Sequence, residues 1–295
     1  MTLQHIKLMA FDADDTLWDC QSHFDRVEQS FCQLLAEYGD AHTLSTALFE
    51  TEKRNMPTLG YGTKAFTLSL IETAIAVSNG RVSARIIEEV MQMGRSLLTF
   101  PTTPLPSVED TLIALNARAD RDNFEMIVFT KGELQDQLNK FKRSGLANYF
   151  DDCCVVADKT EAEYRHLCVE RGIKPSQLLM IGNSFKSDIA PVLAIGAHAV
   201  HVPFSVAWKM ELSETFDRGP LPPDIVSGSG YVTWPTSFPN RTTKPVSSLT
   251  SRTAVTGNDS PASTFPFAND QSSYPGRCTH ANTRPPPSAA SAAPS

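Results

Sequence analysis

Two aspartates with one residue between them, Asp12 and Asp14, follow the apolar segment 6–11 near the start of the chain. That segment is short and apolar except for Lys7, which predicts a strand buried in a sheet. Carboxylates at the end of a buried strand are costly unless a cation or a reaction requires them. Side chains at i and i+2 of an extended chain point the same way, so both carboxylates are expected to face one small volume. Ligands of open α/β sheets bind at this end of the strands, which makes the pair a candidate catalytic site.

The composition is that of a globular protein, with 295 residues, 41% hydrophobic residues and a net charge of −7. This charge provides no basic surface for nucleic acid. The six cysteines form no CxxC motif and no metal-ligand spacing with histidine, which favours buried thiols in a reducing compartment. The chain enters its first strand without a leader and lacks the roughly 20-residue apolar stretch of a membrane span. We therefore expect a cytoplasmic protein that binds neither nucleic acid nor a membrane.

The hydrophobic pattern divides the chain into an α/β core and an inserted helical segment. After residue 18, apolar residues recur at the three- and four-residue steps of amphipathic helices. This pattern ends at the stretch 101–106, which is rich in proline and other helix breakers. We predict an α-helical cap domain over residues 19–104, inserted into a core made of residues 1–18 and 105–219.

Strands and helices alternate in the second part of this core. Short apolar runs predict strands over residues 124–130, 153–157, 178–182 and 199–202. Helical patterns between them predict helices over residues 108–118, 134–141, 161–172 and 186–195. Ser107 and Asp110 match a capping box at the start of the first helix, and Gly145 matches the C-cap of the second. Single helices between strands imply right-handed crossovers, so the predicted fold is a Rossmann-like parallel sheet of the α/β class.

The last part of the chain, residues 220–295, has a different composition. It is rich in proline, serine and threonine and has no apolar period, so it cannot bury enough surface to offset the entropy of ordering. We predict a disordered tail. The sequence leaves open whether this tail binds a partner or has no binding role, and whether it is a divergent terminus.

Polar residues also lie at the carboxyl ends of the other predicted strands. They are Thr130 with Lys131, Lys159, and Asp188 together with Asn183. Taken singly, such a threonine is usually a helix cap, such a lysine is usually solvated and a Gly-Asn-Ser run is usually a turn. Because the carboxyl ends of parallel strands meet at one edge of the sheet, the whole set is expected to form one site.

With these motifs, the segment from about residue 7 to residue 206 resembles the haloacid dehalogenase-like hydrolases, and in particular the phosphatases with a helical cap after the first motif. The resemblance implies Asp12 as nucleophile and Asp14 as general acid/base. It implies three phosphate-binding residues, Thr130, Lys131 and Lys159. It also implies a Mg²⁺ ion held by Asp12, Asp188 and the backbone carbonyl of Asp14. The implied function is hydrolysis of a small phosphorylated metabolite through an aspartyl-phosphate.

The chemistry of these residues agrees with the implied roles. Magnesium takes oxygen ligands, typically one or two carboxylates with a substrate phosphate, and reduces repulsion between two anions that must react. A lysine such as Lys159 stabilises charge on the transferred phosphoryl oxygens, and Thr130 with the backbone N–H groups after it can hold another oxygen.

Two alternatives remain open. Dehalogenases of the family lack an acid two residues after the nucleophile, because a halide leaves without a proton, so Asp14 disfavours a 2-haloacid dehalogenase. A catalytically weak regulatory or binding protein is the other alternative, because Asn183 stands where the family often has aspartate. Asparagine keeps an oxygen acceptor but loses a charge. If Asn183 acts through a metal-bound water, activity survives with weaker magnesium binding, and we favour this because Asp188 remains. If it ligates the ion directly, turnover is impaired.

The inserted helices are expected to close over the phosphate and exclude water. The segment 59–66 resembles the cap loop that reaches the active site in such enzymes, which makes Tyr61 and Lys64 candidates for substrate contacts. The alternative is a helix-entry turn whose Phe66 packs into the cap. Trp18 is expected either to flank the substrate or to pack between cap and core.

Overall fold

The computed structural model describes residues 5–118, 121–205 and 225–227. The strands of this part of the chain form one parallel sheet in the order β3-β2-β1-β4-β5-β6. Their bounds are β1 (Leu8–Phe11), β2 (Glu125–Lys131), β3 (Asp152–Val156), β4 (Leu178–Gly182), β5 (His198–His201) and β6 (Ile225–Ser227). The predicted Rossmann-like parallel sheet is therefore confirmed.

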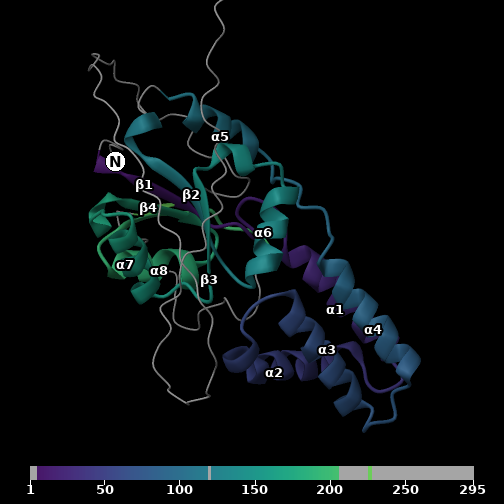
Figure 1. Ribbon diagram of the computed structural model, residues 1–295. Helices are drawn as coiled ribbons and strands as arrows, with labels where there is room; N and C mark the ends of the chain where they lie inside the picture. The colour runs from purple at the N-terminus through teal and green to yellow at the C-terminus, as the bar shows by residue number, and fades with distance from the viewer. Residues whose placement is uncertain (1–4, 119–120, 206–224, 228–295) are drawn as a thin grey trace, which may run out of the picture.

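Helices cover both faces of this sheet (Figure 1). They are α5 (Val108–Asn116) and α6 (Leu134–Arg143) in one hydrophobic cluster, and α7 (Glu161–Glu170) and α8 (Ala190–Ala194) in the other. Successive strand residues point to opposite faces. Phe11 packs in the cluster that contains Phe141 of α6, and Ala10 packs in the cluster that contains Leu167 of α7. Strands buried on both faces account for the continuous apolar runs in the sequence.

A separate bundle of helices lies beside the sheet (Figure 1). It consists of α1 (Gln21–Leu34), α2 (Ala41–Leu59), α3 (Thr63–Val77) and α4 (Ala84–Leu97). Each helix contributes to one hydrophobic cluster, with Phe31, Leu44, Leu70 and Val90. The chain enters and leaves this bundle at adjacent points, because Leu105 N–H donates to the Leu17 carbonyl at 2.9 Å. The domain boundaries at residues 18 and 104 remain predictions.

The first strand is the point at which the order of the strands reverses. β2 and β3 lie on one side of β1, and β4, β5 and β6 lie on the other. Ligands of doubly wound sheets bind at the carboxyl ends of the strands at such a point. Asp12 directly follows β1 and Asn183 directly follows β4, so the topology brings the first and fourth motifs to the same crevice.

Local differences from the predicted elements concern helix ends. The predicted capping box is wrong: Ser107 has a φ of 67° and its side chain makes no cap hydrogen bond, while its carbonyl accepts one from Thr111 Oγ1 at 2.8 Å. Gly145 follows α6 in the left-handed conformation expected of it, with a φ of 74°. The predicted helix 186–195 is divided into a π-helical turn (Phe185–Ile189) and α8.

The predicted tail, residues 220–295, lies almost wholly outside the described residues. The exception is β6, a parallel partner of β5 that the sequence pattern did not predict. Cys278 also lies outside the described residues, and the other five cysteines are buried free thiols. Among the residues that are described, none of the helices has the length and apolar character needed to span a membrane.

Candidate active site

Lys159 connects the first and fourth motifs at the edge of the sheet. Its ammonium group lies 2.5 Å from Asp12 Oδ1 and 2.6 Å from Asp188 Oδ1. All three residues are buried, although Asp12 and Lys159 lie on loops after β1 and β3, and Asp188 lies in the π-helical turn after β4. When ionised, the three groups together carry one excess negative charge. This arrangement suits a further cation or a reaction that consumes the charge.

The fourth motif holds Asp188 from two directions. Ser184 N–H donates to Asp188 Oδ2 at 2.9 Å, while Lys159 contacts the other oxygen. Gly182 leaves space for this carboxylate, because a Cβ atom at position 182 would lie 2.3 Å from Asp188 Oδ2. The glycine at the end of β4 therefore allows the Asp188 carboxylate to lie directly against the sheet.

The surroundings of Asp12 change the pKa of its carboxyl group. Burial raises the pKa of the Asp12 carboxyl to about 7, the Lys159 ammonium opposes this rise and the Asp188 carboxylate adds to it. A carboxylate nucleophile must be ionised to attack. Additional positive charge near Asp12 and Asp188 would therefore favour the reactive form of Asp12.

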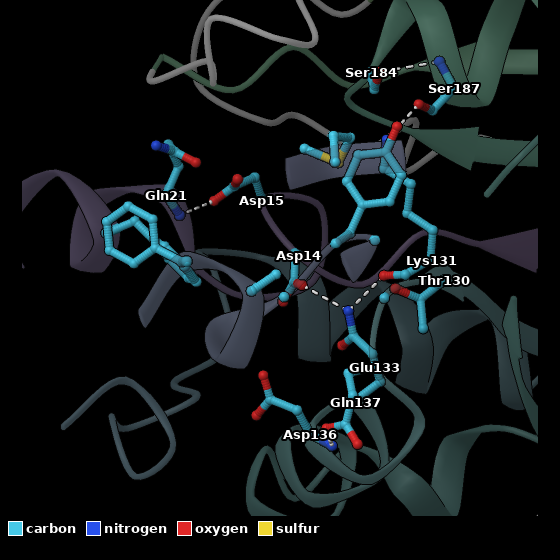
Figure 2. Close-up of a pocket in the computed structure, with 18 of the residues that line it drawn as sticks. Asp14, Asp15, Gln21, Thr130, Lys131, Glu133, Asp136, Gln137, Ser184 and Ser187 are labelled. Carbon is cyan, nitrogen blue, oxygen red and sulfur yellow. Dashed lines mark hydrogen bonds between the residues drawn. The ribbon is translucent and has the colours of Figure 1, made fainter. Parts of the chain in front are cut away.

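Three donors hold the Asp14 carboxylate. Lys140 Nζ lies 2.6 Å and Gln137 Nε2 lies 2.9 Å from Asp14 Oδ2, and Trp18 Nε1 donates to Asp14 Oδ1 at 2.8 Å. Figure 2 shows the Gln137 amide between Asp14 and the backbone of Lys131. Burial alone would raise the pKa of Asp14, but the charge and hydrogen bond of Lys140, aided by the other two donors, hold it below its usual value. Asp14 is therefore an ionised proton acceptor in this arrangement.

Thr16 links the nucleophile turn to the fourth motif. Its hydroxyl accepts from Asn183 N–H at 3.0 Å and can donate to Asp12 Oδ2 at 3.1 Å or to Asn183 Oδ1 at 3.2 Å. Asn183 thus lies beside Asp12 and lines the same cavity. Its action through a metal-bound water stays a prediction.

A cavity of about 170 Å³ separates the sheet edge from the helical bundle. The predicted residues Asp12, Asp14, Thr130, Lys131, Lys159, Asn183 and Asp188 all line it, as does Tyr61. Lys131 Nζ donates to Ser187 Oγ at 2.9 Å and lies 4.1 Å from the centre of the Tyr61 ring. The second motif and the bundle therefore meet across the cavity.

Lys64 and Trp18 do not line this cavity, whereas Phe66 does. Lys64 is outside the cavity wall and pairs with Glu133 at 2.9 Å, so its predicted substrate contact has no support in this arrangement. Phe66 both packs in the bundle core and lines the cavity. Trp18 packs in the core cluster that contains α5 and α6, and its indole N–H is joined to the site by the hydrogen bond to Asp14.

The start of the bundle is attached to the nucleophile turn. Asp15, with a φ of 63°, accepts hydrogen bonds from Cys20 N–H at 2.8 Å and from Gln21 N–H at 2.9 Å. Its carboxylate thereby occupies the amino end of α1, where unpaired N–H groups need acceptors. The turn that carries the two catalytic candidates thus also fixes where α1 begins.

The oxygen donors at this edge fit a magnesium ion. Within the described ranges, no group of three or more His, Cys, Asp or Glu side chains forms a metal site. Magnesium needs fewer protein ligands, because it keeps several waters and takes one or two carboxylates with a substrate phosphate. Asp12 and Asp188 provide two hard oxygen donors on the wall of one cavity. Their assignment as ligands, with the carbonyl of Asp14, remains a prediction.

Comparison with known proteins identifies the family. A family model of haloacid dehalogenase-like hydrolases matches residues 6–196. The chain belongs to the haloacid dehalogenase-like hydrolase family. The family resemblance carried by the motifs is thereby confirmed.

Relatives with known structure or function extend this result. A solved haloacid dehalogenase-like family hydrolase from Xanthomonas campestris is 34% identical with a TM-score of 0.64, over 69% of this chain and 84% of that one. A glyceraldehyde 3-phosphate phosphatase of Methanothermobacter thermautotrophicus is 22% identical over 209 residues, which are 67% of this chain and 85% of the relative. A dehalogenase solved with an intermediate complex is 15% identical with a TM-score of 0.51, over 69% of this chain and 87% of that one, a likeness of fold alone.

Sequence reasoning missed the residues that surround Asp14 in this family member. Gln137 and Lys140 are three residues apart on α6 and are both buried. In the sequence, these two residues are only a polar pair at helical spacing next to apolar positions. The same pattern occurs on an ordinary half-exposed helix face. Thr16 was missed as well, although it lies in the same turn as the two aspartates.

Proposed function

We propose that this hydrolase is a magnesium-dependent phosphatase that acts on a small phosphorylated metabolite through an aspartyl-phosphate. The observation that carries the proposal is the cluster of Asp12, Lys159 and Asp188, joined by contacts of 2.5 and 2.6 Å on the wall of one cavity. Thr130 and Lys131 line the same cavity and offer a hydroxyl and an ammonium group to phosphate oxygens.

Each residue has one chemical task in this mechanism. The Asp12 carboxylate attacks phosphorus and the ester oxygen leaves as an alcohol, after which water hydrolyses the aspartyl-phosphate. Lys159 stabilises negative charge on the phosphoryl oxygens. Asp12, Asp188 and the Asp14 carbonyl would hold magnesium, which would neutralise charge between the nucleophile and the phosphate.

Asp14 transfers the protons of both steps. It accepts a proton from the attacking water in the second step, a role that suits its lowered pKa. In the first step it gives a proton to the leaving alkoxide, so it must take one up beforehand. Lys140, at 2.6 Å, stays a cation and lowers the pKa of Asp14, so this proton is taken up from solvent. A halide would need no such proton, which favours an ester as substrate over a 2-haloacid.

The helical bundle completes the site as a cap. Its residues line the cavity opposite the sheet edge, where closure of the cap would limit the access of water to the phosphoryl group. The relative named glyceraldehyde 3-phosphate phosphatase supports the class of substrate, a small phosphorylated metabolite. It leaves the identity of the metabolite open.

Phosphate release tests the proposal directly. The purified protein is assayed with p-nitrophenyl phosphate and a panel of small phosphate esters, with magnesium and after chelation, and Asp12 is tested for a phosphoryl adduct by mass spectrometry after acid quench. We expect magnesium-dependent release that Asp12→Asn abolishes and Asp14→Asn lowers by about 10²- to 10⁴-fold. Asp110→Asn is the matched control, because Asp110 is exposed on α5 and lies outside the cavity.

Two results would replace this function by another. Halide release from 2-haloacids without phosphate release would make the chain a dehalogenase. No turnover of any ester, followed by a large gain of activity in Asn183→Asp, would make it a regulatory or binding member whose catalysis is impaired at the fourth motif.

A further inference from the structure

The cavity has a charged side and an apolar side. At the sheet edge its wall carries ionisable groups, among them Asp12, Lys159 and Lys140. Among the described residues of the bundle that line the opposite wall, none is a lysine or arginine. The apolar residues of this wall are Phe24 of α1, Met56 of α2, Tyr61 of the connection before α3, and Ala65 and Phe66 of α3. An ester that joins an anionic phosphoryl group to an apolar alcohol would match both sides.

Part of this apolar wall is not used by the core of the bundle. Met56 and Tyr61 are half-buried, and they are not part of the hydrophobic cluster that the four helices form. Phe24 is also half-buried and packs against that cluster, with 5.1 Å between the centres of its ring and the Phe66 ring. Apolar surface that faces a cavity stays in contact with water, and covering it with an apolar group is favourable in proportion to the area removed from water.

The connection between α2 and α3 fixes the position of the Tyr61 ring. Gly60, with a φ of 69°, and Gly62, with a φ of 125°, flank it in conformations that side-chain-bearing residues rarely adopt. Gly62 lies against the core, because a Cβ atom at this position would be 3.4 Å from Glu133 Cβ. Lys131 Nζ lies 4.1 Å from the centre of the Tyr61 ring. An aromatic ring is therefore held beside the second motif.

The polar side chains of the bundle wall already have partners. Hydrogen bonds within the bundle join Gln21 to Asp25 at 2.8 Å, Glu28 to Ser45 at 2.5 Å and Asn55 to Ser69 at 3.1 Å. Glu52 has a partner as well. A polar organic group would compete with these interactions, whereas an apolar group leaves them intact.

The direction of the ester in the cavity brings its organic part to this wall. In the proposed mechanism the phosphoryl group lies at Asp12 and Lys159, and Asp14 gives a proton to the leaving oxygen. The organic part then extends from that oxygen across the cavity, toward the bundle. Met56, Tyr61 and Phe24 are the half-buried apolar side chains that it meets there, together with Ala65.

We propose that the organic part of the substrate carries an apolar group, best matched by an aromatic ring, that packs against Met56, Tyr61 and Phe24. The proposal rests on the phosphatase function proposed above. A ring fits best because aromatic side chains and thioether sulfur both make favourable contacts with aromatic rings. The substrate class is therefore the phosphate monoesters of apolar alcohols.

Esters of primary alcohols test this class, because their leaving oxygens are similar in basicity. They are benzyl phosphate, propyl phosphate and glycerol 3-phosphate, of which the last two share a three-carbon chain. We expect kcat/KM for benzyl phosphate to exceed that for propyl phosphate by about tenfold or more, since one methylene group in an apolar pocket already contributes about tenfold. Propyl phosphate is expected to exceed glycerol 3-phosphate by about threefold or more, because hydroxyl groups lose water there without gaining partners.

Phosphonates, which cannot be hydrolysed at the P–C bond, separate binding from chemistry. Benzylphosphonate is expected to inhibit the hydrolysis of p-nitrophenyl phosphate at a concentration about tenfold lower than propylphosphonate does. This measurement does not depend on how well either alcohol leaves.

Variants then assign the preference to the bundle wall through ratios, which cancel general effects on catalysis. Met56→Gln keeps the length of the side chain but makes it polar, and is expected to lower the ratio of kcat/KM for benzyl phosphate to that for glycerol 3-phosphate by about fivefold or more. Met56→Leu stays apolar and is expected to keep most of the ratio. Met91→Gln, at a 37% exposed position of α4 outside the cavity, is the matched control and is expected to leave the ratio unchanged.

The outcomes separate the two proposals. Equal turnover of benzyl and propyl phosphate, or a preference for glycerol 3-phosphate, overturns this inference while the phosphatase function stands. An unchanged ratio in Met56→Gln, or equal inhibition by the two phosphonates, also overturns it. No phosphate release from any ester, including p-nitrophenyl phosphate, refutes the proposed function, and this inference with it.

Discussion

The ion pair between Lys140 and Asp14 lies at the centre of the residue-scale chemistry. Lys140 is 3% exposed and its ammonium group lies 2.6 Å from Asp14 Oδ2. Burial disfavours the charged lysine, but Asp14 more than offsets this effect and the pKa of Lys140 is raised. Both groups are therefore ionised, and each compensates for the desolvation of the other.

Removing one partner of this pair is expected to be costly. We predict that Lys140→Met lowers the free energy of unfolding by about 1–3 kcal/mol, because it leaves the partly buried Asp14 carboxylate without its cation. The double variant Lys140→Met with Asp14→Asn is expected to recover much of that loss, as measured by urea denaturation. Lys142→Met, at an exposed position of the same helix, serves as control. Additive losses in the double variant would contradict the pairing.

At this scale the sequence predicts the acids better than their partners. Asp12, Asp14 and Asp188, and also Lys159, the partner of Asp12, were predicted because charges at the ends of predicted buried strands are conspicuous. Lys140 was not, because a lysine in an amphipathic helix is usually solvated and only the packing of α6 buries it. Partners of a charge that come from a distant helix depend on tertiary contacts, which the local pattern does not contain.

The last residue of the strand β4, Gly182, determines where the Asp188 carboxylate lies. We predict that Gly182→Ala lowers kcat/KM by more than about tenfold, because the new Cβ atom would lie 2.3 Å from Asp188 Oδ2 and displace that carboxylate. The affinity for magnesium, followed by isothermal titration, is expected to fall with it. Gly39→Ala is the matched control, since a Cβ atom there meets its neighbours at 3.6 Å. Equal activity of both variants would show that Asp188 tolerates a shift.

Asp15, at the amino end of α1, is expected to make the stability of the protein depend on pH. Burial raises the pKa of Asp15 to about 7, while hydrogen bonds from the backbone of Gln21 and Cys20 oppose the rise. The unfolded value is about 3.9. The folded state therefore holds this proton more tightly, so the stability that it contributes is present at low pH and is lost as pH rises toward about 7.

A comparison with Asp15→Asn isolates this contribution. Between about pH 5 and pH 8, the magnesium-free wild type is expected to lose more than about 1 kcal/mol of unfolding free energy relative to the variant. Urea denaturation of both proteins in the presence of a chelator measures the difference. A gain of the wild type over the same range would mean that the N–H groups of α1 keep the Asp15 carboxyl ionised.

The helix α6 shows why element boundaries are easier to predict than element faces. Its range follows from the periodicity of Leu134, Leu138 and Phe141, yet Leu134 is 40% exposed while Asp136 and Gln137 are buried. The helix turns its polar residues toward the site and leaves an apolar one in solvent. Burial follows the chemistry of the cavity here, and a rule based on hydrophobicity alone finds Phe141 but misses Asp136 and Gln137.

At the scale of the whole molecule, the sequence indicates an inserted bundle but not how it faces the core. The change from strand to helical periods after residue 18 can be recognised from neighbouring residues. The packing of α3 against α6 cannot, because it depends on contacts between residues that are far apart in the sequence. Thr63 Oγ1 donates to Asp136 Oδ2 at 2.9 Å in a buried contact, and Lys64 pairs with Glu133 at 2.9 Å on the surface. Both join the bundle to the helix after the second motif.

The two contacts are expected to differ in importance. Thr63→Val keeps the side-chain shape and removes the buried donor, which leaves Asp136 without a partner at a cost of about 1–3 kcal/mol. Lys64→Ala removes an ion pair whose lysine side chain is 61% exposed, and such pairs contribute at most about 1 kcal/mol. We therefore predict that hydrogen–deuterium exchange at the start of α3 accelerates about tenfold or more in Thr63→Val and much less in Lys64→Ala. Equal acceleration in both variants would mean that surface charge, rather than the buried hydrogen bond, holds the bundle over the cavity.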